Sequence, residues 1–299
     1  MNYYWFVGLV LNGITTAVDI SVMAKDDLHA INPTNIGFYF YDRNNPSTPF
    51  EINDTNTISN SSFNISRNTV FVTHGFTESF KDCSIIKDAF LKKHDVNIIV
   101  IDWSKYTMTA YLEISELCDL ISSFIKKLVS ENDLQLSKTS LVGFSLGAHI
   151  MGVVGRDLGG SCDQVIGLDP VGIGFHIIEA SQRLSTSSGK FVHVIHTNGD
   201  QFGYYQPLGH ADYYPNGGKK QPGCEWEILG VCDHLRSMDY FGESVSSGRF
   251  RALKCNDYSQ FKQKNCSADV SFMGEFPVDK RASGIYFLDT NGVPPYAKG

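Results

Sequence analysis

Up to residue 196 the chain alternates short, nearly continuous apolar runs with segments whose apolar residues recur every three or four positions. The apolar runs cover residues 36–41, 69–73, 97–102, 163–169 and 191–196, with a shorter one at Leu141 and Val142. Such runs are typical of strands buried on both faces of a sheet. Between them, residues 84–94 fit a helix, and residues 111–128 place apolar side chains on one helical face. This alternation predicts an α/β fold with a mostly parallel central sheet and helices on both faces.

The segment Gly-Phe-Ser-Leu-Gly at residues 143–147 matches the G-x-S-x-G pattern of a nucleophile elbow, in which a strand turns sharply into a helix. The next residues, 148–154, fit that helix. The turn strains the serine backbone and brings neighbouring turns close together, so only hydrogen side chains fit at Gly143 and Gly147. The Leu146 amide, at the positive end of the helix, can bind a developing oxyanion. The pattern also occurs by chance, so Ser145 is a candidate nucleophile that needs partners elsewhere.

A serine hydroxyl needs a histidine to take its proton and a carboxylate to orient that histidine. In α/β-hydrolases the order along the chain is Ser, acid, His. Asp169 ends a strand after the elbow, and Pro170 fixes the chain as it leaves the sheet. An aspartate in this place is often only a turn former or helix cap, but the elbow upstream favours a catalytic role. The second oxyanion amide of this fold comes from an early strand-to-helix loop, which predicts Phe76 after the strand at residues 69–73.

Five histidines follow the candidate acid and compete for the role of general base: His176, His193, His196, His210 and His234. His193 alternates within a strand and fits a packed side chain, while His196 and His210 fit structural hydrogen bonds. His234 lies in Cys-Asp-His-Leu-Arg at residues 232–236, in a loop that we expect a disulfide to close. A loop held in this way can present an imidazole to the serine, so His234 is the predicted base.

Length and composition suit one large α/β domain, with 299 residues and 42% hydrophobic content. Residues 199–223 are rich in Gly, Tyr, Asn and Pro and fit loops, but no linker, repeat or low-complexity tract indicates a second domain. The net charge is −7 and the Lys and Arg residues are scattered. This charge gives no basis for nucleic-acid binding and no attraction to anionic membranes.

The first 17 residues contain a short apolar core that ends in small residues. They predict a signal peptide cleaved after Ala17, followed by a single domain at residues 18–299. No Lys or Arg precedes the apolar core, so a buried N-terminal strand is the alternative. We therefore expect a secreted, extracellular protein.

Cysteines and glycosylation sequons fit secretion. Seven cysteines suggest disulfides, and their odd number leaves at least one thiol outside them. The stretch at residues 44–68 is rich in Asn, Ser and Thr and fits exposed loops or edge strands. Its sequons make Asn53, Asn60 and Asn64 glycosylation candidates, whereas Asn265 is a poorer one because Cys266 follows it.

Several segments, in order and with similar spacing, resemble the pancreatic lipase family between about residues 34 and 290. They are T-H-G-F at 73–76, V-G-F-S-L-G-A-H at 142–149, G-L-D-P at 167–170, F-V-H-V-I-H-T-N-G at 191–199, G-H-A-D-Y-Y-P-N-G-G at 209–218, Q-P-G-C at 221–224 and C-D-H-L-R-S at 232–237. The resemblance implies Ser145, Asp169 and His234 as nucleophile, acid and base, with the Phe76 and Leu146 amides in the oxyanion hole. It implies an α/β-hydrolase fold and a secreted hydrolase of glycerolipid esters.

The chain departs from the triacylglycerol lipases of this family in the loop over the active site. Only seven residues separate Cys224 from Cys232, too few for an amphipathic lid helix. The loop between His196 and Gly209 also looks shorter than in pancreatic lipase. Both features resemble venom phospholipases A1 and some insect lipases, whose sites are open. We therefore expect little interfacial activation and room for a polar head group.

Other expectations also depend on the resemblance. It implies the disulfides Cys224–Cys232 and Cys255–Cys266 and leaves Cys83, Cys118 and Cys162 unassigned. We expect no metal and no cofactor, because the calcium-binding carboxylates of pancreatic lipase align with Ala180, Ser185 and Ser188. Phe144 stands where His or Tyr is common in the family, and we expect it to face away from the nucleophile's oxygen. The C-terminal β-sandwich that binds colipase in larger relatives is not expected, nor is colipase.

Together these features predict an sn-1 phospholipase (phospholipase A1) that acts on phospholipid at a membrane or micelle surface. A neutral triacylglycerol lipase is the alternative. A non-catalytic lipid-binding protein, similar to the insect yolk proteins that lack the serine, and a hydrolase of small soluble esters are further alternatives.

Overall fold

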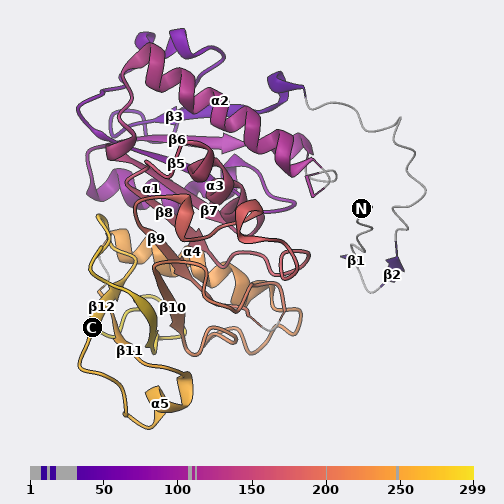
Figure 1. The fold of residues 1–299 in the computed structure, drawn as a ribbon, viewed down its shortest axis with the longest axis vertical. Helices are drawn as coiled ribbons and strands as arrows, with labels where there is room; N and C mark the ends of the chain where they lie inside the picture. Colours follow the sequence, from indigo (N-terminus) through magenta and orange to yellow (C-terminus); the bar gives the residue numbers. More distant parts are fainter. Residues whose placement is uncertain are drawn as a thin grey trace.

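The computed structural model describes residues 8–11, 14–17, 32–106, 110–111, 113–199, 201–246 and 249–299. Within these ranges, one eleven-stranded sheet has the strand order β12-β11-β13-β10-β9-β8-β7-β5-β6-β3-β4 (Figure 1). In chain order the strands are β3 (Gly37–Tyr41), β4 (Phe50–Glu51), β5 (Asn68–Thr73), β6 (Val96–Asp102), β7 (Thr139–Phe144), β8 (Gln164–Leu168), β9 (Val192–Ile195), β10 (Ala211–Pro215), β11 (Phe250–Lys254), β12 (Val270–Met273) and β13 (Gly284–Leu288). In the order of the sheet, the seven strands β13-β10-β9-β8-β7-β5-β6 are parallel to their neighbours. The outer strands β11 and β12 at one end, and β3 and β4 at the other, pair antiparallel. The predicted α/β fold with a mostly parallel sheet is confirmed.

Helices cover both faces of this sheet (Figure 1). The helices α2 (Ile114–Asn132) and α3 (Leu146–Asp157) pack on one face, and α1 (Ser84–Lys93) and α4 (Val231–Ser246) pack on the other. Strand β5 illustrates why the central strands are apolar throughout, because Phe71 faces the first pair of helices while Val70 and Val72 face the second. A short helix, α5 (Tyr258–Lys262), lies in the C-terminal part of the chain.

One part of the predicted strand pattern needs correction. Residues 211–215 fell in the predicted loop-rich stretch but form β10, a strand that is buried throughout. Its sequence, Ala-Asp-Tyr-Tyr-Pro, looks like a loop because the Asp212 carboxylate is polar. In the fold this carboxylate accepts hydrogen bonds from His196 and from the backbone amides of Leu208 and Gly209, so burial leaves it satisfied.

The predicted signal peptide at residues 1–17 lies largely outside the described residues. Within it, β1 (Gly8–Leu11) and β2 (Ile14–Ala17) pair antiparallel as a two-stranded sheet separate from the central one. Among the described residues, the structure has no helix that is both long and apolar enough to span a membrane.

His193 on β9 is buried, as its alternation in the sequence predicts. Its ring stacks on Tyr213, and its Nε2 accepts the Gly274 N–H at 3.1 Å. Burial lowers the pKa of His193 to about 3. The folded protein therefore keeps this imidazole neutral under conditions in which an unfolded chain would protonate it.

We expect His193 to destabilise the protein in mild acid. Between the unfolded pKa of about 6.5 and the folded value of about 3, the unfolded chain binds one proton more, so the free energy of unfolding falls as pH falls. His193→Gln, which keeps an acceptor for Gly274, should reduce this slope by about 1.4 kcal/mol per pH unit. Urea denaturation at several pH values between 6 and 4 measures it. His176→Gln, at an exposed histidine, is the control for losing one histidine; equal slopes in the two variants would contradict the assignment.

Candidate active site

Ser145 sits at the sharp turn between β7 and α3, where its backbone has φ 55° and ψ −120°. A non-glycine residue in this region stores on the order of 1–3 kcal/mol of strain. A Cβ on Gly143 would lie 2.2 Å from the Gly147 carbonyl oxygen, and one on Gly147 would lie 2.3 Å from the His74 carbonyl oxygen. The strained serine and the crowded glycines expected from the motif are both present, and the turn presents Ser145 at the carboxyl edge of the sheet.

Ser145, His234 and Asp169 form one chain of hydrogen bonds. The Ser145 hydroxyl donates to His234 Nε2 at 2.8 Å, and His234 Nδ1–H donates to Asp169 Oδ2 at 2.5 Å. These partners fix the neutral tautomer that carries its proton on Nδ1 and leaves Nε2 free to accept. The structure thus brings together the three residues that the sequence selects from separate segments of the chain.

The Asp169 carboxylate is fully buried just after β8, where its own φ is 39°. Its second oxygen, Oδ1, accepts the backbone N–H groups of Thr197 at 2.7 Å and Asn198 at 3.0 Å, directly after β9. A Cβ on Gly203 would lie only 2.6 Å from this oxygen. The carboxylate is thus held in a single position by two backbone amides, by the imidazole and by the glycine packed against it.

His234 is not carried on a loop as the sequence predicts, but lies in the first turn of α4. The helix begins here because Glu227 supplies its N-terminal amides with an acceptor. The Glu227 carboxylate accepts from Leu229 at 2.6 Å and from Cys232 at 3.1 Å. The Cys224–Cys232 disulfide then links the start of this helix to the segment that precedes the loop. The base is therefore fixed by a capped helix as well as by a covalent bond.

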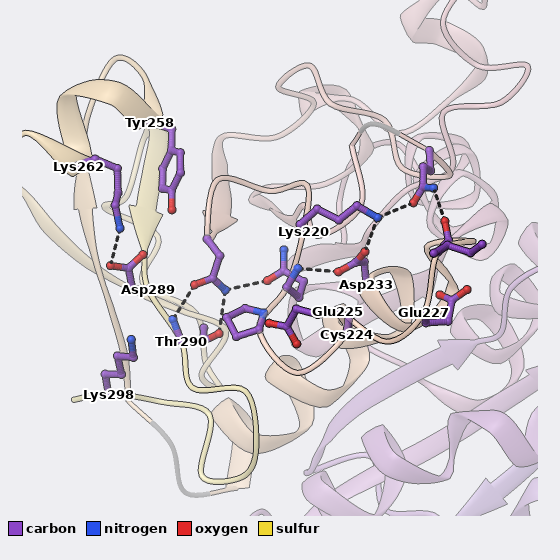
Figure 2. A pocket seen from close by; sticks show the side chains of 15 residues that line it. Lys220, Cys224, Glu225, Glu227, Asp233, Tyr258, Lys262, Asp289, Thr290 and Lys298 are labelled. Atoms are coloured by element: carbon purple, nitrogen blue, oxygen red, sulfur yellow. Dashed lines mark hydrogen bonds and ion pairs between the residues drawn. The ribbon is translucent and has the colours of Figure 1, made fainter.

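A polar network supports this helix start (Figure 2). Asp233, next to the base, is buried and accepts the Gln221 N–H at 2.6 Å and Lys220 Nζ at 3.0 Å. Lys220 also donates to the Gln201 side chain, whose Nε2 donates to the Ile228 carbonyl at 3.1 Å. These groups line a cavity of about 830 Å³ that the triad residues do not line. The network joins the segment after β9, the segment after β10 and the disulfide loop.

The two predicted oxyanion amides belong to segments that are next to the nucleophile. Leu146 is the first residue of α3, so its N–H has no partner within the helix. Phe76 follows Gly75, and a Cβ on Gly75 would lie 3.0 Å from Ser145 Cβ. The loop after β5 therefore packs directly against the nucleophile, which is the arrangement that an oxyanion hole requires.

The other singled-out histidines have structural partners. His196 is buried, with Nε2 2.9 Å from Asp212 Oδ1 and Nδ1 2.7 Å from the Tyr204 carbonyl. His210 Nδ1 accepts the Val192 N–H at 2.9 Å. Neither reaches the nucleophile, in agreement with their interpretation as structural hydrogen-bonding groups.

Phe144 contacts the base, which the sequence analysis did not anticipate. The centre of its ring lies 4.6 Å from that of the His234 imidazole. An aromatic side chain at this position therefore forms one wall beside the imidazole and helps to exclude water from it.

The structure joins Cys224 to Cys232 and Cys255 to Cys266, the pairs that the resemblance implies. Cys83, Cys118 and Cys162 are free and buried, and burial raises the pKa of each thiol. Buried, protonated thiols are unreactive. Among the described residues, no three His, Cys, Asp or Glu side chains gather as a metal site would require.

Sequence reasoning missed the carboxylates that position this site. Glu227 caps α4, and Glu78 accepts the Gly75 N–H at 2.7 Å beside the nucleophile. The signal for Glu227 was its place just before a segment with apolar residues at helical spacing. The signal for Glu78 was an acid three residues after a turn glycine, which is too common to select it.

The parallel sheet, the strained serine and the hydrogen-bonded imidazole and carboxylate define the class of the α/β-hydrolases. Residues 12–296 match the family model described as Lipase. The chain is 35% identical to Lipase member H of Xenopus tropicalis over 95% of its length, and 32% identical to pancreatic triacylglycerol lipase of Sus scrofa over 87%. The chain belongs to the pancreatic lipase family, a family of carboxylic ester hydrolases. The chain spans 65% of the length of Lipase member H of Xenopus tropicalis and 56% of the length of Lipase member H-B of Xenopus laevis.

Gly203 provides a test of how tightly the acid must be held. Gly203→Ala should displace Asp169, because the new Cβ would lie 2.6 Å from Oδ1, and misplacing a catalytic group can cost on the order of 10²-fold in kcat. Steady-state hydrolysis of p-nitrophenyl butyrate measures the change. Gly209→Ala is the matched control, since its Cβ would crowd the Val192 carbonyl at 2.7 Å but not the acid. Equal kcat values for the two folded variants would contradict this role of Gly203.

Proposed function

We propose that the chain is a secreted serine hydrolase that cleaves fatty-acyl esters of glycerolipids, with the sn-1 ester of phospholipids as its preferred substrate. The observation that carries the chemistry is the continuous hydrogen-bonded chain from Ser145 through His234 to the buried Asp169. Nucleophile, base and acid stand within hydrogen-bond reach of one another, as acyl transfer through a serine requires.

In the proposed mechanism, His234 Nε2 takes the Ser145 proton as the hydroxyl oxygen attacks the ester carbonyl. The carbonyl oxygen becomes an oxyanion that the Phe76 and Leu146 amides bind. Asp169 orients the imidazole and stabilises its protonated form, which then gives the proton to the leaving alcohol. A water molecule, activated by the same base, releases the fatty acid from the acyl-enzyme.

Ser145→Ala should reduce turnover by several orders of magnitude while leaving the unfolding midpoint close to that of the wild type. A fluorescent organophosphonate that modifies active serines should label the wild type and not this variant. Ser59→Ala, at an exposed serine that donates to the Asn56 carbonyl, is the control and should be labelled fully. An unlabelled wild type would favour a non-catalytic lipid-binding protein. Undiminished esterase activity in Ser145→Ala would contradict the assignment of the nucleophile.

The proposed substrate class depends on the loop between Cys224 and Cys232. Its residues 225–230 form turns and bends without a helix, so nothing in it can act as a helical lid. Gln201 holds the Ile228 carbonyl, and the Trp226 indole donates to the Gly223 carbonyl at 3.0 Å. A short loop with so many fixed points cannot fold over the triad as a helical lid, and we propose that this leaves room for a polar head group.

The same loop supports action at a lipid surface. The side chains of Trp226 and Ile228 are about four-fifths exposed, at 77% and 84%, and Leu229 is 55% exposed. These apolar side chains are held in water just before α4, the helix that carries His234, and they gain free energy when a lipid surface covers them. We propose that they contact the membrane or micelle that contains the substrate.

A neutral triacylglycerol lipase is the second candidate, because the relatives that match at 31–32% identity include pancreatic triacylglycerol lipases. Release of fatty acid from phosphatidylcholine with different acyl chains at sn-1 and sn-2, and from triolein, separates the two. We expect faster release of the sn-1 chain of phosphatidylcholine than of fatty acid from triolein. Faster hydrolysis of triolein would favour the triacylglycerol lipase, and equal rates on monomeric and aggregated esters would favour a hydrolase of small soluble esters.

For the whole chain, we propose a signal peptide at residues 1–17 and a single hydrolase domain at residues 18–299, with no need for colipase or a cofactor. The two disulfides support an oxidising compartment. Asn53, Asn60 and Asn64 are exposed and stay glycosylation candidates.

A further inference from the structure

The loop that carries Phe76 contains a turn with a strained backbone. Residues 75–78 form a turn in which the Glu78 N–H points to the Gly75 carbonyl at 3.4 Å. The third residue, Thr77, has φ 64°. A β-branched side chain is a rare outlier in this region, which glycine favours. The local sequence therefore does not select this turn, and contacts from outside the strained residue must hold it.

Glu78 supplies such a contact through its side chain. Its carboxylate Oε2 accepts the Gly75 N–H at 2.7 Å, while its own N–H faces the Gly75 carbonyl. Both polar groups of the glycine are thus bound by one residue. A Cβ on Gly75 would lie 3.2 Å from Oε2 and 3.0 Å from Ser145 Cβ, so the carboxylate and the nucleophile flank the same glycine.

The Gly75 carbonyl is held from a second side by His74. The His74 Nδ1–H donates to it at 2.8 Å. The His74 Nε2 lies 3.1 Å from the Trp103 N and 3.2 Å from Asp102 Oδ1, and these contacts fix the imidazole. In a planar trans peptide the carbonyl and the following N–H point in opposite directions. Holding the Gly75 carbonyl against His74 therefore directs the Phe76 N–H to the opposite side of the peptide.

We propose that Glu78 is a positioning residue of the oxyanion hole, whose carboxylate binds the Gly75 N–H and holds the Gly75–Phe76 peptide so that the Phe76 N–H faces the substrate's carbonyl oxygen. The inference rests on the proposed function. It assigns to Glu78 no contact with substrate, because the residue acts through the backbone of its own turn.

Burial raises the pKa of Glu78, and Asp82 raises it further, while the Gly75 N–H, His74 and His234 favour its charged form. The Gly75 N–H is the strongest of the groups that favour the charge, so the hydrogen bond that holds the turn also stabilises the carboxylate that makes it.

Three variants test the proposal on p-nitrophenyl butyrate, a soluble ester that does not depend on a lipid surface. Glu78→Ala should lower kcat by about tenfold with little change in KM, less than the loss of a whole oxyanion donor. Glu78→Gln keeps an acceptor for Gly75 and should stay within about threefold of the wild type. Asp257→Ala is the matched control, because it removes a carboxylate that accepts the Gln260 N–H far from the triad.

Amide hydrogen exchange provides a readout that needs no turnover. Exchange at Gly75 should accelerate in Glu78→Ala and stay near wild type in Glu78→Gln. A wild-type kcat in Glu78→Ala, or equal losses of kcat in both Glu78 variants, would overturn the proposal while leaving the triad assignment intact. If the wild type hydrolyses no ester, the proposed function fails, and unchanged Gly75 exchange in Glu78→Ala would overturn the positioning role separately.

Discussion

The site depends on a carboxylate buried without any exposure to solvent. An ionised group in that position costs several kcal/mol unless polar partners replace its water. Asp169 has such partners in the Thr197 and Asn198 amides and in the His234 imidazole. These come from the end of β9 and from the start of α4, so satisfying one charge determines where two distant segments meet. The fold around the site can be understood as the set of contacts that makes this burial tolerable.

The sequence predicted the parts of the site that follow from local pattern. Ser145 and Asp169 each end an apolar strand, and adjacent parallel strands bring their carboxyl ends to one edge. Those positions needed no knowledge of tertiary contacts. The histidine was found as well, but its setting was wrong, because the helix that carries it begins only where Glu227 caps it and a disulfide fixes the preceding turn. Capping by a carboxylate five residues before Cys232 is a local contact, but hydrophobic spacing alone does not reveal it.

Other features were missed for similar reasons. Strand β10 carries an aspartate that is compatible with a buried strand because His196, directly after β9, and the Leu208 and Gly209 amides bind its carboxylate. Phe144 contacts the imidazole because a helix from far along the chain places His234 there. Glu78 binds a glycine three residues away, yet the turn that brings them together contains a strained threonine that no local preference predicts. Residue spacing alone reveals none of these contacts, because two of them depend on other segments of the chain and the third depends on a strained turn.

The fixed loop between Cys224 and Cys232 has a thermodynamic consequence. A protein whose binding-competent state is only a fraction of its population binds with an apparent affinity reduced by that fraction. A mobile lid over the active site reduces the apparent affinity in this way whenever the enzyme is away from a lipid surface. In return, it prevents the enzyme from hydrolysing other lipids around it. The loop here is held by a disulfide, a capped helix and the Gln201 side chain, and it contains no helix that could form such a lid. On the proposed function, restraint of this hydrolase must then come from where its substrate is located, and not from a conformational equilibrium of its own.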